Sequence, residues 1–278
     1  RTKIMKLSPL PATFSNGCLT ADGGCNQGSK DGKMKRPTDI AGQNFIVTGA
    51  AKGIGLAIST LFQSLGAHVS GWDLDDSDMK DNPVFADSQI VDVTQPLQTK
   101  AGFAASLAAL GEVDGIVANA GVNGPTKPLW EYSLAEWQMV MSVDLTGVFL
   151  TVQAALGHLR ARQRGRVIII SSIAGKEGNP GAVPYGAAKA GVIGFAKGLA
   201  REVLPSEITV NCIAPSIAMT DLLDGMSADY IADKKSRIPM GRLCTPEEIA
   251  NVAAFIASPA CSFTTGQVFD VTGGRATW

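Results

Sequence analysis

The sequence predicts an α/β protein built on a parallel sheet. From about residue 41 onward, short β-branched runs alternate with longer helical patterns, as in consecutive βαβ units. The runs are short and almost continuously apolar, which is typical of strands buried on both faces. With 278 residues, of which 45% are hydrophobic, the chain is long enough for a large core. Because the alternation continues to the end, we expect a single domain over residues 41–278.

The first βαβ unit is the clearest. Residues 44–48 read as a strand, residues 49–53 as a turn, and apolar residues then recur at helical spacing until Gly66 ends the helix. A proline and two glutamates after Thr245 are a start signal for a helix over 246–258. The other strand candidates are 67–72, 88–91, 113–118, 166–171, 208–213 and 267–271, which makes seven strands, and further helices are expected at 134–163 and 184–204.

Charge and hydropathy exclude several classes of partner. The net charge is -1, so the chain has no general basic field that would attract nucleic acid or an acidic membrane. Residues 1–36 carry seven Lys or Arg and two Asp, and we expect residues 1–40 to form a flexible basic extension, with a processed targeting segment left open. No run approaches the roughly 18 apolar residues of a membrane span. We therefore expect a cytoplasmic protein that binds neither nucleic acid nor membrane.

The cysteines and histidines do not predict a metal site. The five cysteines are odd in number and form no CxxC pair, which argues against a disulfide framework or a zinc site and favours reduced thiols. Both histidines, His68 and His158, are expected to be structural.

A glycine-rich segment lies between the first strand and its helix. Residues 48–55 have the spacing TGxxxGxG. Glycines let the backbone turn sharply and approach a pyrophosphate, while the free N–H groups at the helix start attract its oxygens. The same spacing also fits a turn that only packs a helix on a sheet. The predicted strand before the segment and the predicted helix after it are what favour a dinucleotide site. The cofactor-binding candidates here are Gly49, Lys52, Gly53, Ile54 and Gly55.

Asp73 favours NAD over NADP. It ends the second strand, where a carboxylate can accept hydrogen bonds from the adenosine ribose and would repel a 2′-phosphate. Asp75, Asp76 and Asp78 add negative charge, although a solvated acidic loop would look the same. Lys52 argues the other way, because a cation there could partner a 2′-phosphate. Four acids outweigh one lysine.

A tyrosine and a lysine four residues apart suggest acid–base chemistry. Tyr185 and Lys189 share one face of a predicted helix. A nearby ammonium favours the phenolate and makes the phenol a usable general acid and base. Alone, the spacing is common by chance and more often marks a packing tyrosine and a surface lysine; its position after the other motifs is what favours chemistry. Ser171 and Ser172 end a strand at the edge where α/β sheets bind ligands, and since adjacent strand residues point to opposite faces, only one should reach a substrate.

Together these motifs resemble the short-chain dehydrogenase/reductase family over residues 41–278. The resemblance rests on residues 48–55, on Asn119-Ala120-Gly121, and on Ser172, Tyr185 and Lys189. It implies a Rossmann-type, doubly wound parallel seven-stranded sheet with helices on both faces. It also implies that Ser172 positions the substrate oxygen, that Tyr185 transfers the proton, and that Lys189 binds the nicotinamide ribose and promotes ionisation of Tyr185.

The resemblance extends to further cofactor positions. Asp92-Val93 match the family's adenine-contacting pair, and Asn119-Ala120-Gly121 match a turn that stabilises the sheet and contacts the cofactor. Thr220 matches a position that contacts the carboxamide. Pro215 is also carried over, but Ser216 follows it where the family usually has glycine, which concerns the shape of the loop.

Asp144 is a second departure from the family. The family usually has asparagine at this position, a residue thought to hold a water in the proton relay. The backbone carbonyl of Asp144 would still be available to that water. We keep Asp144 as a catalytic candidate and expect an altered pH dependence of the reaction, not lost activity.

The predicted substrate region gives conflicting signals. Specificity should lie in the loop after Ser172 and in residues 216–240, which would form a lid. Residues 172–179 and 261–275 look similar to bacterial members that act on deoxy sugar acids. The apolar candidates for lining the site are Met219, Leu222, Leu223 and Met226, and the candidates for binding a polar or carboxylated compound are Lys176, Glu177, Asn179 and Arg275.

The leading expectation is an NAD-linked oxidoreductase acting on a secondary alcohol or ketone, namely a small polyol or keto sugar acid. An NADPH-dependent 3-oxoacyl-carrier-protein reductase is one alternative, and a non-catalytic NAD-binding scaffold is another, because fold alone does not fix function. By resemblance we also expect a homotetramer formed through the two long central helices and the last strand.

Overall fold

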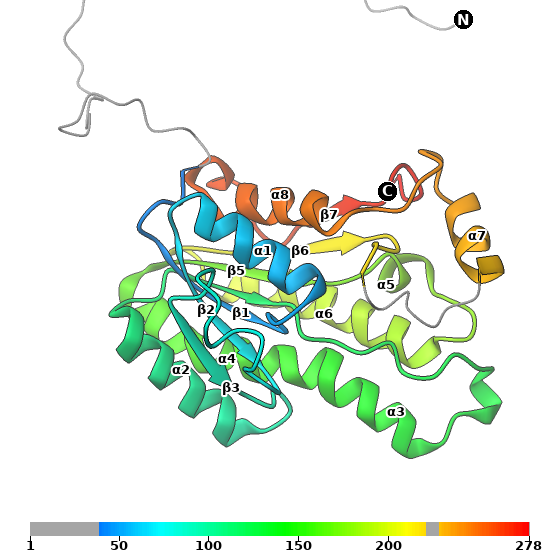
Figure 1. The fold of residues 1–278 in the computed structure, drawn as a ribbon, viewed down its shortest axis with the longest axis horizontal. Coiled ribbons are helices and arrows are strands. Elements are labelled where there is room, and N and C mark those ends of the chain that lie inside the picture. The colour runs from blue at the N-terminus through cyan, green and yellow to red at the C-terminus, as the bar shows by residue number, and fades with distance from the viewer. Residues whose placement is uncertain (1–38, 221–227, 278) are drawn as a thin grey trace, which may run out of the picture. The chain divides into compact units, whose positions relative to one another are not determined.

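The computed structural model describes residues 39–220 and 228–277. These form a seven-stranded parallel sheet, which confirms the predicted fold class (Figure 1). The strand order is β3-β2-β1-β4-β5-β6-β7. The chain therefore winds outward from β1 in one direction, returns, and winds outward from β4 in the other, so β1 and β4 flank the switch point where such sheets bind ligands. The bounds are β1 Asn44–Thr48, β2 His68–Asp73, β3 Asp87–Ile90, β4 Gly115–Ala118, β5 Arg164–Ile170, β6 Glu207–Pro215 and β7 Val268–Val271.

Helices cover both faces of the sheet (Figure 1). One apolar core joins the sheet to α1 (Gly53–Ser64) and α8 (Pro246–Ala257), where Ile58 and Phe62 are fully buried. The second core joins the opposite face to α2 (Pro96–Leu110), α4 (Gly147–Arg162) and α6 (Val183–Glu202). Ile40 is fully buried in the first core, so the described domain already includes it. The predicted basic extension lies outside the described residues, apart from its last two.

The helix predicted over 134–163 is interrupted at its centre. It consists of α3 (Leu134–Met141), a π-helical turn η2 (Ser142–Thr146) and α4. Such turns add one residue to a helix and often occur at functional sites. Among the described residues, this helix, Leu134–Arg162, is long and apolar enough to cross a membrane by length and composition. One face of its α4 part nevertheless packs in the second core, as core helices of globular domains do.

The sequence did not predict α2, α5 (Ala174–Glu177), the 3-10 helices η1 (Leu129–Glu131) and η4 (Pro259–Cys261), or α7 (Ala228–Ser236). The buried face of α2 is formed by Thr99, Gly102, Phe103 and Ser106, so it lacks the large apolar stripe by which a helix is recognised. The predicted lid, residues 216–240, contains α7, while residues 221–227 lie outside the described part of the chain.

Candidate active site

The glycine turn brings bare backbone to the switch point of the sheet. Gly49 and Gly53 have φ values of +64° and +58°, a region that favours glycine. A side chain at Gly49 would lie 3.0 Å from the Cα of Ala120, and one at Gly55 would lie 2.0 Å from the Gly49 carbonyl oxygen. The turn therefore has no room for side chains on these sides. A cradle of backbone at a helix start fits the pyrophosphate of a dinucleotide.

Asn119 joins the ends of β1 and β4. Its side-chain amide donates to the carbonyl oxygens of Thr48 (2.9 Å) and Gly49 (3.1 Å). In return, the Thr48 hydroxyl accepts from the backbone N–H groups of Asn119 and Ala120, both at 3.0 Å. These four bonds hold the glycine turn against the loop after β4. Thr220 lies at the same turn, with its methyl group 3.5 Å from the position of a Cβ on Gly53.

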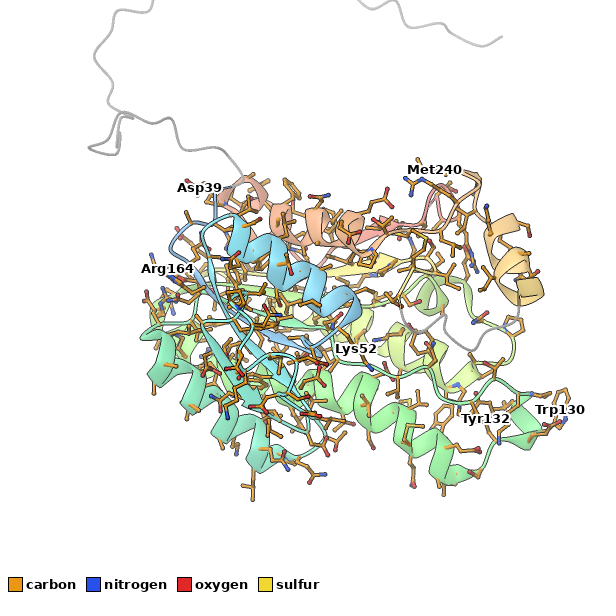
Figure 2. The ribbon with its side chains drawn as sticks, viewed as in Figure 1. Asp39, Lys52, Trp130, Tyr132, Arg164 and Met240 are labelled. Atoms are coloured by element: carbon orange, nitrogen blue, oxygen red, sulfur yellow. The ribbon has the colours of Figure 1, made fainter. Side chains whose placement is uncertain are left out.

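Asp73 is held at the end of β2, facing the glycine turn. One carboxylate oxygen accepts from the Ala51 N–H at 3.0 Å, and the other accepts from the Leu74 N–H at 2.8 Å. Lys52 is exposed at the entry to α1 (Figure 2). Asp92 follows β3 and its carboxylate accepts from the N–H and hydroxyl of Thr94, while Val93 is buried. The structure thus brings these predicted residues to the carboxyl edge of the sheet.

The structure distinguishes the two serines after β5. The Ser171 hydroxyl donates to the carbonyl oxygen of Lys189 at 2.8 Å and is used to fix α6 against the strand. The Ser172 hydroxyl oxygen accepts from the Ala174 N–H at 3.1 Å. This contact uses only an acceptor position, so the Ser172 hydroxyl hydrogen can be donated to another group.

Tyr185 and Lys189 lie one turn apart near the start of α6. The Lys189 ammonium lies 5.6 Å from the centre of the Tyr185 ring and donates to the Ile170 carbonyl oxygen at 3.1 Å. It also forms an ion pair with Asp144 at 3.1 Å. Burial acts to lower the pKa of Lys189, but Asp144 and Tyr185 outweigh it, so the pKa of Lys189 is raised. Burial raises the pKa of Asp144, and Lys189 limits that rise.

The loop after β6 completes this edge. The carbonyl oxygen of Pro215 accepts from the Ile173 N–H at 2.9 Å, which ties the loop to the segment after Ser172. Ser216 is buried, and its hydroxyl has no hydrogen-bond partner among the described residues.

Each charged residue predicted to bind a polar substrate is in an ion pair within the chain. The Lys176 ammonium lies 2.7 Å from an Asp270 carboxylate oxygen, and the Arg275 guanidinium lies 2.8 Å from Glu177. In the first pair, the cation lies on α5 and the anion lies on β7. In the second pair, the anion lies on α5 and the cation lies in the segment after β7, called the C-terminal segment below. As placed, Lys176, Glu177 and Arg275 hold the chain together, a role that sequence spacing did not reveal.

Two further features of the site were missed because they depend on tertiary contacts. Gly175 allows α5 to lie against α6, since a Cβ there would be 2.6 Å from the backbone carbon of Lys189. Tyr132 lies between η1 and α3 (Figure 2), and its hydroxyl donates to the carbonyl of Gly181 at 3.2 Å, just before α6. Neither residue belongs to a motif. Within the described ranges, no group of three or more His, Cys, Asp or Glu side chains is placed to hold a metal ion.

A glycine turn at the switch point of a parallel sheet, with serine, tyrosine and lysine at the same edge, defines a class of NAD(P)-dependent oxidoreductases. Residues 49–276 match the family model described as Enoyl-(Acyl carrier protein) reductase. The chain belongs to the short-chain dehydrogenase/reductase family, whose members act on hydroxyl or keto groups.

Curated relatives and solved structures agree with this family. The chain is 37% identical over 241 residues to 2-dehydro-3-deoxy-L-rhamnonate dehydrogenase (NAD(+)) of Sphingomonas sp. (strain SKA58), covering 86% of this chain and 97% of the relative. It is 39% identical over 235 residues to cis-4-hydroxycyclohexanecarboxylate dehydrogenase of Sinomonas cyclohexanicum, covering 82% and 94%. The crystal structure of 3-ketoacyl-(acyl-carrier-protein) reductase from Brucella melitensis complexed with NADH superposes with a TM-score of 0.80 at 27% identity, covering 85% and 99%.

Proposed function

We propose that this protein is an NAD-dependent dehydrogenase that oxidises a secondary hydroxyl group on a small polyol or keto sugar acid. The observation that carries the proposal is the convergence of Ser172, Tyr185 and Lys189 at the edge of the sheet that also bears the glycine turn. Strand β5 delivers Ser172 and helix α6 delivers the other two, and the bond between the Ser171 hydroxyl and the Lys189 carbonyl fixes these elements together.

Asp73 supports NAD as the cofactor. Its carboxylate is held at the end of β2 beside the glycine turn. A ribose with two free hydroxyls suits this carboxylate, and a 2′-phosphate would meet its negative charge. The residues that would hold the dinucleotide are those of the glycine turn with Asp73, the pair Asp92-Val93, the turn Asn119-Ala120-Gly121, and Tyr185, Lys189, Pro215 and Thr220.

The side chains have distinct roles in the proposed mechanism. A bound NAD would supply the hydride acceptor for the carbon that bears the hydroxyl. Ser172 donates its hydroxyl hydrogen to the substrate oxygen and so orients it. Tyr185 must first be ionised to the phenolate, which Lys189 stabilises. The phenolate then takes the proton that the substrate oxygen releases. In the reverse direction Tyr185 returns the proton to the carbonyl oxygen.

Some of the relatives support an acidic substrate, while the 3-oxoacyl-carrier-protein reductases among them support the alternative. Two of the relatives are named for acting on hydroxylated carboxylic acids, a deoxy sugar acid and a cyclohexane acid. The ion pairs of Lys176 and Arg275 show that these cations are already neutralised. We therefore propose that the substrate carboxylate is oriented mainly by neutral donors around Ser172, and that a small polyol is accepted as well.

Steady-state assays with NAD and NADP on a panel of alcohols, polyols and sugar acids test the proposal. We expect turnover with NAD and a hydroxy or keto sugar acid, and its loss in Tyr185→Phe. Preference for NADPH and a 3-oxoacyl thioester would favour the carrier-protein reductase instead. NADH binding without turnover of any compound would indicate a non-catalytic scaffold, and a fully active Tyr185→Phe variant would refute the mechanism.

We also propose a cytoplasmic homotetramer, in which α4, α6 and β7 contact other copies. The rings of Phe149 on α4 and Phe195 on α6 lie 6.5 Å apart, and Phe149 is partly exposed. A Cβ at Gly194 would meet no atom within 4 Å, so this face of α6 leaves room for a neighbour, whereas Gly191 packs on Leu145 of the same chain. Light scattering that gives the mass of a monomer would refute the tetramer.

A further inference from the structure

A fully buried carboxylate lies next to the lysine of the candidate active site. Asp144 has no exposed surface and Lys189 is 3% exposed, and their charged atoms lie 3.1 Å apart. Removing one member of such a pair leaves the other charge buried and unpaired, which is strongly unfavourable. The resemblance to the family implies an uncharged asparagine at this position, and the carboxylate of Asp144 departs from that pattern.

The surroundings of Asp144 hold its carboxylate in place. The Val122 N–H lies 3.3 Å from both carboxylate oxygens. On the same side, a Cβ at Gly121 would lie 2.5 Å from one of these oxygens and 3.2 Å from the Lys189 ammonium nitrogen, so only glycine leaves room for the pair. The π-helical turn Ser142–Thr146 carries Asp144 into this position. The fold therefore fixes the Asp144 carboxylate beside Lys189.

We propose that Asp144 is the counter-ion of Lys189 and sets the pH at which Tyr185 becomes able to take a proton from the substrate. This inference rests on the proposed function. Asp144 has no exposed surface and contacts Lys189, so it would act on Tyr185 through that lysine and is a positioning residue. With aspartate, the fixed charge of the pair beneath Tyr185 is zero. With asparagine it would be +1, and the phenolate would be favoured at lower pH.

The other charged groups on the surrounding elements do not replace Asp144. Strand β6 contributes Cys212, whose pKa burial raises to about 12, so its thiol is uncharged in the relevant range. Strand β5 contributes only the neutral carbonyl of Ile170 to the ammonium. Helix α5 carries the charges of Lys176 and Glu177, which are paired with Asp270 on β7 and with Arg275 after β7. On α3, Glu136 is paired with Lys127 in the loop after β4.

The decisive experiment compares Asp144→Asn with Asp114→Asn. Asp114 is also a partly buried carboxylate in an ion pair, with Arg162 at 2.8 Å, but it precedes β4 at the opposite edge of the sheet. The oxidation rate should rise with pH and the reduction rate should fall. We expect the midpoints of both transitions to lie about one pH unit lower in Asp144→Asn. Asp114→Asn should change stability without moving either profile. A purely structural role for Asp144 would lower the rate at every pH and leave the profiles where they are.

A second measurement does not depend on the substrate. The ultraviolet absorbance of tyrosinate, titrated with and without Tyr185→Phe, reports ionisation of Tyr185 alone, and it should shift downward by the same amount in Asp144→Asn. A shifted titration in a protein that turns over no sugar acid would support the inference while refuting the proposed function. An unshifted titration would overturn the inference. If Asp144→Asn fails to fold, Asp144→Ser makes the same change of charge with a smaller side chain and is judged by the same titration.

Discussion

Gly55→Ala tests whether the glycine turn is defined by close packing of backbone on backbone. The added Cβ would lie 2.0 Å from the carbonyl oxygen of Gly49 and 2.8 Å from the Asn119 amide nitrogen. Ordinary contact begins at 3.4 Å, so α1 and the turn must separate by 3.4 - 2.0 = 1.4 Å. The obstructing atom is backbone and has no rotamer to change. The displacement would also lift Ile58 and Phe62, which are fully buried, away from the sheet.

Overpacking of this kind costs about 3 kcal/mol in the free energy of unfolding. With a urea slope of about 3 kcal/mol/M, the midpoint of unfolding should fall by about 1 M. Fluorescence of Trp72 can follow the transition, because this side chain is fully buried on β2 and its indole N–H donates to Ser106. NADH affinity, measured by fluorescence titration, should fall at least about tenfold, since displacements near 1 Å at a site have effects of this size or larger.

The matched control is Gly157→Ala in α4. The same methyl group there meets no atom within 4 Å, so only the helix preference of alanine acts and the protein should gain about 0.5–1 kcal/mol. Equal urea midpoints for the two variants, together with unchanged NADH affinity in Gly55→Ala, would show that the contact is relieved without cost and that our reading of the turn is wrong.

Three further predictions concern neighbouring contacts. Asn119→Ala should lower the free energy of unfolding by about 2 kcal/mol in urea, because two backbone carbonyls lose their donor; no change would mean that water replaces the amide. Glu177→Arg should lower kcat/KM, and adding Arg275→Glu should restore it; failure of the double variant to recover would exclude the ion pair as the cause. Hydrogen bonding to Arg242 lowers the pKa of Glu248 to about 2 from 4.5, so the ionised Glu248 stabilises the fold above about pH 4.5 and this contribution is lost as the pH falls toward 2. Glu248→Gln should therefore make Tm less dependent on pH between these values. An unchanged dependence of Tm on pH would contradict this.

The sequence predicted the parts of the fold that local pattern determines. Strand β1 has the predicted bounds, 44–48, because its apolar run ends at a glycine turn. The helix predicted at 246–258 ends one residue earlier, and its start is fixed by a capping box in which Thr245 and Glu248 bond each other's backbone. Helix α2 was missed because Phe103 is the only large apolar residue on its buried face, which otherwise consists of small and polar residues. The packing that makes Gly102 suitable there involves Val91, which follows β3, and no local pattern contains this contact.

The sequence predicted the site residues that belong to motifs, but not the hydrogen-bond and ion-pair partners of those residues. Spacing identified Ser172, Tyr185 and Lys189 as candidates, and strand alternation required that only one of the two serines face a substrate. It could not say which, because that depends on the bond from Ser171 to α6. Ion pairs were hidden for a similar reason. Lys176 and Asp270 are 94 positions apart in the chain, and only the order of β5, β6 and β7 brings them together.

The same backbone contacts that build the site also hold the sheet together. The Lys189 ammonium binds the last carbonyl of β5, and the Ser171 hydroxyl binds the carbonyl of Lys189, so α6 is joined to the end of β5 at one of the three candidate catalytic residues. Asn119 joins β1 to β4 in the same way. Substitutions at these residues should therefore change stability and activity together. The pair of Glu177 and Arg275 differs, because it joins only α5 to the C-terminal segment. Its loss should change the position of the loop after Ser172 while the sheet stays intact, which separates control of the substrate loop from stability of the fold.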